Sequence, residues 1–285
     1  MTQKYAIDTL LAQAGNRTDE RTGAVSTPIF LSTAYGHHGI GESTGFDYTR
    51  TKNPTRAVLE ETIAQLEKGE RGFACSSGMA AIQLLMSLFT APDEWIVSSD
   101  VYGGTYRLLD FCYKNTHGVK PVYVNTASVQ AIEAAITPNT KAIFIETPSN
   151  PLMEECDVDA IAQVAKRHNL LLIVDNTFLT PMLFRPMEHG ADIVVHSGTK
   201  YLAGHNDVLV GLIVAKGKEL CDRLFYIQNG AGPVLSPFDS WLTIRGMKTL
   251  ALRMQRHEEN AKAIAEFLKQ QLQVKDVLYP NKGGM

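Results

Sequence analysis

The sequence has few cysteines, no long apolar run and no excess of charge of one sign. Its four cysteines are widely spaced and form no C-x-x-C pair: Cys75, Cys112, Cys156 and Cys221. This spacing argues against both a zinc site and a disulfide framework, and it favours a reducing compartment. We therefore expect a cytoplasmic protein that binds no metal.

Membrane and nucleic-acid partners are not indicated either. The longest nearly continuous apolar stretch, AAIQLLMSLF, is far shorter than a bilayer requires. The 27 basic and 30 acidic side chains almost balance, and the basic ones are scattered rather than clustered. The N-terminal stretch lacks the layout of a signal peptide and has the periodicity of a short helix over residues 7–14.

From residue 57 onward, helical patterns alternate with short apolar runs, as in an α/β protein. Helices are predicted over residues 55–70, 76–89 and 157–169. Six strands are predicted over residues 94–99, 120–125, 141–146, 170–175, 192–197 and 208–216. Several of these strands are apolar throughout, which is typical of a mainly parallel sheet flanked by helices on both faces.

The predicted organisation has three parts. Residues 1–45 form an N-terminal arm and residues 46–231 form the large domain. Residues 232–285 contain linking helices, with a glycine interruption at Gly246, and then a strand-like segment that begins a truncated C-terminal domain.

Polar side chains follow several of the predicted strands, at the edge where open parallel sheets bind ligands. Asp175 follows LLLIV, Asn150 lies a few residues past AIFIE, and DIVVH leads into Ser197, Thr199 and Lys200. Lysine is rarely buried without a function or a partner. An aspartate, an asparagine, a lysine and hydroxyls are thus expected at one edge.

One cofactor, pyridoxal phosphate, would use all of these groups. It needs a lysine for its Schiff base, an acid at its pyridine nitrogen, a phosphate cradle and an aromatic ring over its own. Lys200 and Asp175 are candidates for the first two, and Tyr102 for the last. SSGMA at residues 76–80 opens a helix, where free backbone N–H groups favour an anion.

Each residue also has an ordinary structural interpretation. Lys200 could be a solvated loop residue, Asp175 could cap the turn that follows it, and Asn150 could be an ordinary turn residue. Tyr48 and Arg50 could be a surface pair. His196 and His205 are interpreted as structural or polar loop histidines, and Cys75 as a small core residue. Together, however, the candidates fit one ligand.

Six segments resemble, in order and spacing, the Cys/Met-metabolism family of pyridoxal-phosphate enzymes: DYTRTKNPTR, SSGMAA, DVYGGTYR, ETPSNP, VDNTF and HSGTKYLAGH. The resemblance extends from about Ser26 to Ala251. It implies the type I, aspartate-aminotransferase-like fold of pyridoxal-phosphate-dependent transferases.

The resemblance also implies a role for each candidate. Lys200 forms the Schiff base and moves protons, Asp175 pairs with the pyridine nitrogen, and Tyr102 stacks on the ring. The other implied cofactor contacts are Gly78, Met79, Ser197 and Thr199 at the phosphate, Asn150 near the ring hydroxyl, Thr177, and Tyr48 and Arg50 at the phosphate of a neighbouring subunit. The smallest complete site would then be a homodimer, within a dimer or homotetramer that shares its active sites.

The activity implied is γ-replacement on an O-acyl-homoserine by a thiol, cysteine or sulfide, which gives cystathionine or homocysteine in methionine biosynthesis. β- or γ-elimination by a lyase remains an alternative, as does a truncated chain that binds cofactor with little activity. A phosphate-binding α/β protein without pyridoxal phosphate is a further alternative. Family members continue into a C-terminal domain with an arginine for the substrate carboxylate, which none of Arg245, Arg253 and Arg256 matches.

Overall fold

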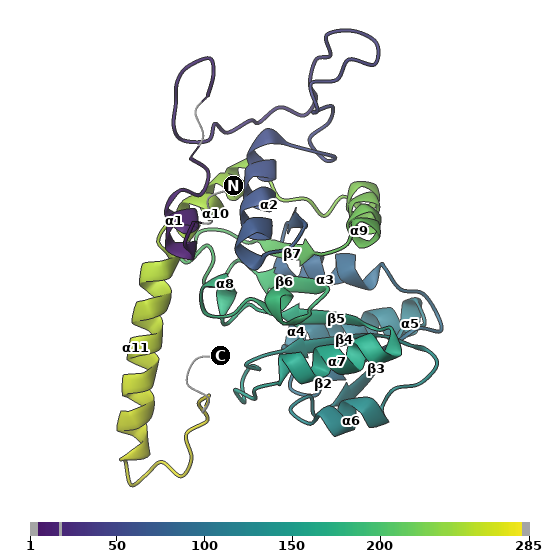
Figure 1. Cartoon of the computed structure of the whole chain (residues 1–285), viewed down its shortest axis with the longest axis vertical. Coiled ribbons are helices and arrows are strands. Elements are labelled where there is room, and N and C mark those ends of the chain that lie inside the picture. The colour runs from purple at the N-terminus through teal and green to yellow at the C-terminus, as the bar shows by residue number, and fades with distance from the viewer. Residues whose placement is uncertain (1–4, 17–18, 281–285) are drawn as a thin grey trace. The chain divides into compact units, whose positions relative to one another are not determined.

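A computed structural model describes residues 5–16 and 19–280 (Figure 1). The chain divides into two compact units. Unit 1 contains the described residues of 1–88 and 192–248, and unit 2 contains those of 89–191 and 249–285.

Unit 1 is built on an antiparallel sheet in which strand β7 lies between β1 and β6. Its elements are α1 (Ile7–Ala12), α2 (Pro54–Glu67), β1 (Arg71–Cys75), α3 (Gly78–Met86), β6 (Ile193–Ser197), β7 (Gly211–Ala215), α9 (Lys218–Ala231) and α10 (Pro237–Met247).

Two glycines show that α2 and α3 cover opposite faces of this sheet. A Cβ atom on Gly72 would lie 2.1 Å from the carbonyl oxygen of Glu60 in α2. A Cβ atom on Gly211 would lie 2.0 Å from the carbonyl oxygen of Ser77, directly before α3. Gly72 pairs with Val214, three residues along β7 from Gly211, so the two glycines face opposite sides. Only glycine permits either helix to approach so closely.

Unit 2 contains a parallel sheet in the order β5-β4-β2-β3. Its elements are β2 (Glu94–Ser98), α4 (Gly103–Arg107), the π-helical turn η1 (Leu108–Tyr113), α5 (Lys114–Thr116), β3 (Lys120–Val124), α6 (Val129–Ala134), β4 (Thr140–Glu146), α7 (Val158–His168), β5 (Leu171–Asp175), α8 (Thr180–Leu183), the 3-10 turn η2 (Pro186–His189) and α11 (Leu250–Lys269).

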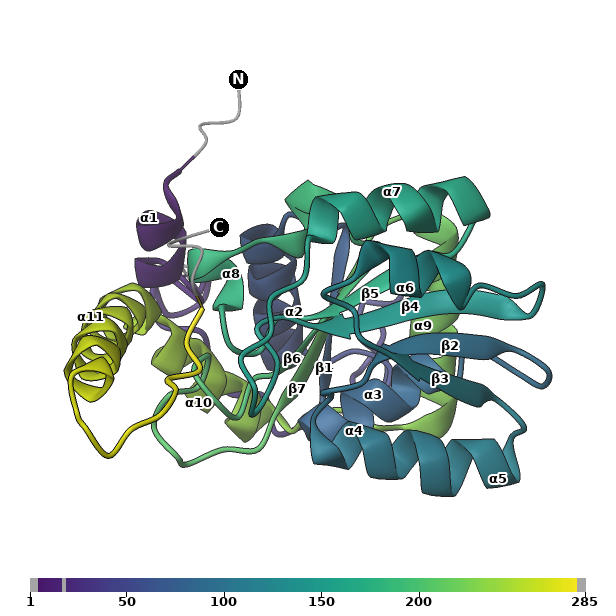
Figure 2. The same ribbon diagram turned by 90° about the horizontal axis from the view of Figure 1, so that it is seen from below.

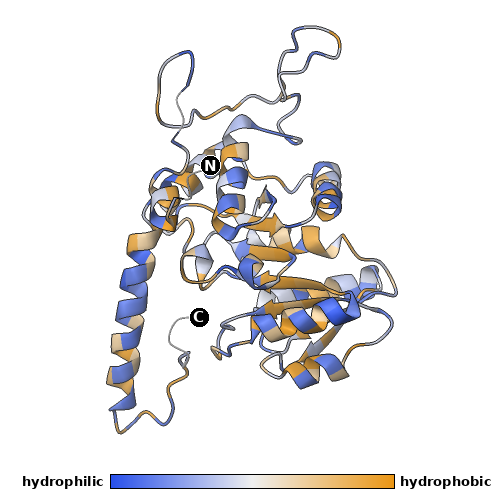
Figure 3. Cartoon of the chain, viewed as in Figure 1, coloured by the Kyte–Doolittle hydropathy of each residue, from blue (hydrophilic) through white to orange (hydrophobic). Residues whose placement is uncertain are grey.

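Helices cover both faces of the unit 2 sheet, which explains its apolar strands. Helices α6 and α7 lie on one side, and the α4–η1–α5 segment lies on the other (Figure 2). The strands are accordingly among the most hydrophobic segments in Figure 3. At the centre, the Trp95 ring stacks on Phe144, with ring centroids 5.9 Å apart, and meets Phe89 edge-on at 4.8 Å.

The six predicted strands are confirmed, and the sheet pairings are mostly parallel as expected. Two features differ from the prediction. Strand β1 was not predicted, because RGFAC is short and carries a glycine. Strand β7 is antiparallel to β6, because residues 198–210 contain no helix to return the chain for a parallel pairing.

The C-terminal segment was predicted only in part. The long helix is interrupted near Gly246 as expected, since α10 ends at Met247 and α11 begins at Leu250. Gly246 itself serves packing, because a Cβ atom there would lie 2.1 Å from the carbonyl oxygen of Ala203. The predicted strand after residue 273 is absent from residues 274–280, and its remainder lies outside the described residues. Among the described helices, none has both the length and the apolar character needed to cross a bilayer.

Candidate active site

The segment predicted to bind a phosphate lies between β1 and α3 in unit 1. Strand β1 ends at Cys75, and the hydroxyl of Ser77 caps α3 by accepting a hydrogen bond from the Ala80 N–H at 3.1 Å. The other N–H groups of the first turn point out of the helix end, where an anion is favoured. A Cβ atom on Gly78 would lie 3.0 Å from Cβ of Ser197, so the end of β6 packs directly against this turn.

The two hydroxyl residues of the Ser197–Lys200 turn, Ser197 and Thr199, have different surroundings. Ser197 is partly exposed beside Gly78. The Thr199 hydroxyl instead donates to the Val210 carbonyl at 3.2 Å and accepts from the Val210 N–H at 2.9 Å. Thr199 thus braces the turn, and its hydroxyl proton is already engaged.

Lys200 follows this turn with an exposed side chain. Its backbone N–H donates to the Ser197 carbonyl at 3.1 Å, and its carbonyl accepts from Gly204. Within the described residues, its ammonium group has no hydrogen bond or ion pair. Lys200 is exposed because the chain leaves the sheet at Ser197. The amine is accessible to a ligand.

Tyr48 and Arg50 lie together on the loop before α2. The Arg50 guanidinium lies 5.5 Å from the centroid of the Tyr48 ring and donates to the backbone and side-chain oxygens of Asn229 in α9. The Thr51 hydroxyl also donates to the Asn229 side chain, at 2.9 Å. The pair is exposed, which suits both a surface pair and a contact with another subunit.

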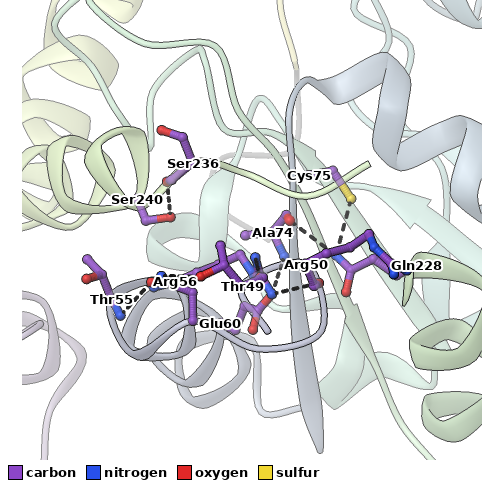
Figure 4. A network of polar contacts seen from close by, with 11 residues as sticks. Thr49, Arg50, Thr55, Arg56, Glu60, Ala74, Cys75, Gln228, Ser236 and Ser240 are labelled. Atoms are coloured by element: carbon purple, nitrogen blue, oxygen red, sulfur yellow. Dashed lines mark hydrogen bonds and ion pairs between the residues drawn. The ribbon is translucent and has the colours of Figure 1, made fainter. Parts of the chain in front are cut away.

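A buried ion pair anchors this loop to strand β1 (Figure 4). The Arg56 side chain, 1% exposed, donates to the Thr49 carbonyl at 2.8 Å and to the Arg50 carbonyl at 3.2 Å. Its Nε lies 3.3 Å from Oε1 of Glu60, and the same oxygen accepts from the Ala74 N–H at 3.0 Å. Burial raises the pKa of the Glu60 carboxyl despite the charge of Arg56. The loop and the strand that enters the phosphate turn are therefore held by one network.

Cys75 belongs to the core, as predicted. It is fully buried, and the side chain of Gln228 donates to the Ala74 carbonyl beside it at 3.2 Å. Burial raises the pKa of the Cys75 thiol to about 12, so the thiol stays protonated. His196 is buried in β6, rather than in a loop, and its Nε2 lies 2.7 Å from Oε1 of Glu67. Among the described residues, no group of side chains could hold a metal ion.

In unit 2, the remaining candidates follow the carboxyl ends of β2, β4 and β5. Asp175 ends β5 with 8% of its surface exposed, and its Oδ1 accepts from the Thr177 N–H at 3.0 Å. Asp175 therefore does cap the following turn, as the structural interpretation suggested. The predicted contact of Asp175 with the cofactor stays a prediction.

Tyr102 and Asn150 lie on neighbouring loops of unit 2. The Tyr102 side chain is 45% exposed at the start of α4, and the Asn150 residue is exposed after β4. Their backbone N–H groups donate to the two oxygens of one carboxylate, that of Glu146, at 2.9 and 3.1 Å. Glu146, which the sequence analysis did not single out, thus connects the two candidate residues.

Burial and the negative charges of Asp175 and Asp100 raise the pKa of Glu146 to about 8. Glu146 pairs with Asp175 across β4 and β5, which places the two acids side by side. Its position at the end of the apolar run AIFIE was the signal that could have identified it. The candidates of unit 1 and those of unit 2 are each grouped by the structure, and their union in one site stays a prediction.

Comparison with known proteins decides the family. The model of the family described as "Cys/Met metabolism PLP-dependent enzyme" matches residues 8–283. The chain belongs to this family. It is therefore a pyridoxal-phosphate-dependent enzyme of sulfur amino-acid metabolism, as the sequence predicted.

Individual relatives of the Cys/Met-metabolism family agree. The chain is 84% identical to a cystathionine gamma-synthase of Haemophilus influenzae over 100% of its own length and 77% of the relative. It is 61% identical to a cystathionine gamma-synthase/O-acetylhomoserine (thiol)-lyase of Bacillus subtilis, over 98% of this chain and 74% of the relative. The cystathionine gamma-lyase of Lactobacillus plantarum, complexed with L-serine, has a TM-score of 0.94 and 47% identity, covering 98% of this chain and 72% of that one. This chain spans about three quarters of its relatives' length, and the type I fold is confirmed.

The residues present fit the family's cofactor. The first turn of α3 begins at Gly78, beside Ser197, and offers backbone N–H groups for a phosphate; Lys200 offers an accessible amine, and Asp175 is a nearly buried carboxylate. Tyr102 offers an exposed aromatic face.

Proposed function

We propose that the chain catalyses γ-replacement on an O-acyl-homoserine, with cysteine or sulfide as the thiol, to form cystathionine or homocysteine. The observation that carries this proposal is the 84% identity, over the whole chain, to a cystathionine gamma-synthase. The relative at 61% identity carries both a synthase and a thiol-lyase name, which supports either thiol.

Pyridoxal phosphate, when bound, supplies an aldehyde for a covalent link to an amine and a ring that accepts electrons from the substrate Cα. Lys200 provides the amine and then takes and returns protons as a general base and acid. The Asp175 carboxylate holds a proton on the ring nitrogen by its charge. Tyr102 covers the ring, and the turn containing Gly78 and Ser197 binds the phosphate.

Elimination by a lyase is the second candidate function. The solved cystathionine gamma-lyase shares the fold at a TM-score of 0.94, and nothing in the described residues separates replacement from elimination. Products separate them. With O-acetyl- or O-succinyl-homoserine and cysteine, we expect cystathionine by mass spectrometry. A keto acid and ammonia without added thiol would instead establish the lyase function, and cofactor binding without either product would establish a chain of little activity.

The cofactor test is the visible spectrum of the purified chain supplied with pyridoxal phosphate. We expect an absorption band of the lysine-bound cofactor in the wild type, a shift of that band with substrate, and no band in Lys200→Ala. The matched control is Lys216→Ala, because Lys216 also follows a strand with an exposed side chain but lies at the opposite edge of the unit 1 sheet. Loss of the band in both variants, or in neither, would contradict the role of Lys200.

We further infer a homodimer or homotetramer in which Tyr48 and Arg50 reach the phosphate of a neighbouring subunit. Apolar side chains on the arm support an interface, since Leu31 is 76% exposed and Ile40 is fully exposed. Mixing inactive Lys200→Ala with inactive Arg50→Ala chains should restore activity, because mixed dimers contain one intact site. No recovery after confirmed subunit exchange would contradict shared sites.

The amino-acid substrates are small molecules, and we place their conversion in the cytoplasm. All four cysteines are free thiols and three of them are buried, which suits a reducing compartment. Cell fractionation of the source organism, with detection of the chain by antibody, tests this placement.

A further inference from the structure

Two loops at the carboxyl edge of the unit 2 sheet are tied to each other by two acidic side chains. One loop follows β2 and carries Asp100 and Tyr102. The other follows β4 and carries Ser149 and Asn150. Each loop, or the strand end that leads into it, supplies a carboxylate that binds groups of the other loop. We call this arrangement, formed by Asp100 and Glu146 and their partners, the reciprocal clamp.

Glu146 forms the first half of the clamp. Its side chain is 6% exposed, and its two oxygens accept from the backbone N–H groups of Tyr102 and Asn150 at 2.9 and 3.1 Å. The backbone of Glu146 is itself fixed, because its N–H lies 3.3 Å from the hydroxyl of Ser98, the last residue of β2. That hydroxyl is in turn 2.7 Å from the Thr126 hydroxyl.

Asp100 forms the second half. Its Oδ2 accepts from the Ser149 hydroxyl at 2.5 Å and from the Leu152 N–H at 3.0 Å. The Ser149 hydroxyl also accepts from the Glu154 N–H at 3.0 Å, which extends the clamp to the end of the second loop. The two loops are thus joined at two points. At the first, Glu146 at the end of β4 accepts from the loop after β2; at the second, Asp100 in the loop after β2 accepts from the loop after β4.

We propose that Glu146 is a positioning residue of the cofactor site, whose carboxylate sets the Tyr102 ring and the Asn150 amide in place through their backbone N–H groups. This proposal rests on the proposed function, in which both residues contact the cofactor ring. Tyr102 and Asn150 have exposed side chains, so their placement depends on the backbone. The two backbone N–H groups donate to the two oxygens of one buried carboxyl group, which fixes the two backbones relative to each other.

The acidic groups around Glu146 also affect which ligands this edge of the sheet favours. Asp175 in β5 and Asp100 in the loop after β2 are the charged groups that act on it, and both are acidic. The three carboxyls together make this edge favourable for a cation, such as a protonated ring nitrogen beside Asp175. Cofactor binding and the proton on Glu146 are therefore coupled in this geometry.

The test compares Glu146→Gln and Glu146→Ala with the wild type by titration with pyridoxal phosphate. Absorbance gives the affinity, and the circular dichroism of the cofactor band reports how firmly the ring is held. Glu146→Ala loses both hydrogen bonds, and we expect at least about tenfold weaker cofactor binding with a weaker dichroic band. Glu146→Gln keeps one carbonyl acceptor, so we expect an intermediate effect and a changed pH dependence of the band.

Glu94→Gln is the matched control. Glu94 is also a largely buried acid in unit 2, but it begins β2 at the opposite end from Tyr102, and it accepts from Lys120 and Thr137. The Glu94→Gln variant shows how the loss of a buried acid elsewhere in the same sheet changes thermal stability and cofactor affinity. We expect lower thermal stability of the cofactor-free chain and an unchanged cofactor affinity and dichroic band.

The outcomes are distinct. Wild-type affinity and dichroism in Glu146→Ala would overturn the positioning role while leaving the proposed function intact. Equal losses in Glu94→Gln and Glu146→Ala would also overturn it, since the effect would then be one of general stability. A wild-type chain that forms no cofactor band would overturn the proposed function, and this proposal with it.

Discussion

Ser197 packs against the backbone of Gly78, so that a methyl group on Gly78 would lie 3.0 Å from Cβ and 3.1 Å from Oγ of Ser197. The end of β6 and the first turn of α3 therefore meet without space between them. This contact lies at the turn that is predicted to bind the phosphate.

Gly78→Ala should weaken cofactor binding by at least about tenfold, because the added methyl must displace Ser197 from the cradle. Titration with pyridoxal phosphate measures the effect. Gly230→Ala in α9 is the control, since a Cβ atom there meets nothing within 4 Å. It should leave cofactor affinity unchanged. An unaffected Gly78→Ala chain would show that the phosphate binds elsewhere.

The buried Arg56–Glu60 pair should matter strongly for stability. Arg56→Met leaves the Glu60 carboxyl buried without its guanidinium, at a cost of about 3 kcal/mol in the free energy of unfolding. In the double variant Arg56→Met/Glu60→Gln, the loss should be smaller than the sum of the single losses. Urea denaturation measures all three.

A more exposed ion pair provides the comparison for the Arg56 and Glu60 variants. Lys262 and Glu258 in α11 are 2.7 Å apart, with side chains 54% and 33% exposed, so their variants should change the free energy of unfolding little. Equal effects for the buried and the exposed pair would show that the Arg56 network contributes no special stability.

The free energy of unfolding of the cofactor-free chain should fall as the pH rises through the range set by Glu146. Its folded-state pKa, about 8, lies above its ordinary value of 4.5, so the folded chain holds a proton that the unfolded chain releases. The contribution is fully present below the ordinary pKa and is lost as the pH rises through the folded-state value. Glu146→Gln should reduce the difference in stability between about pH 5.5 and about pH 8.5.

Glu94→Gln separates this effect from a general one. Hydrogen bonds from Thr137 and Lys120 lower the pKa of Glu94, so its contribution is lost only as the pH falls below its ordinary range. Its variant should keep the wild-type difference between the same two pH values. A wild-type difference in Glu146→Gln would contradict the raised pKa.

Alkylation of the native chain should modify Cys112 first. Cys112 is exposed, whereas Cys75, Cys156 and Cys221 are buried and burial raises the pKa of each thiol. Peptide mapping after a brief iodoacetamide treatment identifies the modified residue. Early modification of Cys75 would mean that strand β1 opens readily.

The sequence predicted the strands of unit 2 well, because parallel strands that are covered on both faces are apolar throughout. It missed β1, and it missed the antiparallel direction of β7, because neither depends on apolar periodicity. Strand β1 is fixed by the close approach of α2 at Gly72, and β7 by the short connection from Ser197.

The sequence analysis could select those candidate site residues that directly follow the end of an apolar strand. Asp175, Ser197 and Lys200 were singled out in this way, and their roles at the cofactor stay a prediction. Glu146 was not, because its importance lies in hydrogen bonds to Tyr102 and Asn150, which are distant from one another in the sequence. The Thr199 hydroxyl is hydrogen-bonded to the backbone of Val210, and its expected contact with the phosphate stays a prediction.

The reciprocal clamp sets a limit on how this site can be redesigned. A loop after β2 taken from another enzyme would arrive without Asp100, which accepts the hydrogen bond from Ser149, and a loop after β4 would arrive without Ser149, which donates to Asp100. Either exchange alone leaves one member of this hydrogen bond without its partner. Chimeras meant to convert replacement into elimination should therefore transplant both loops as one module.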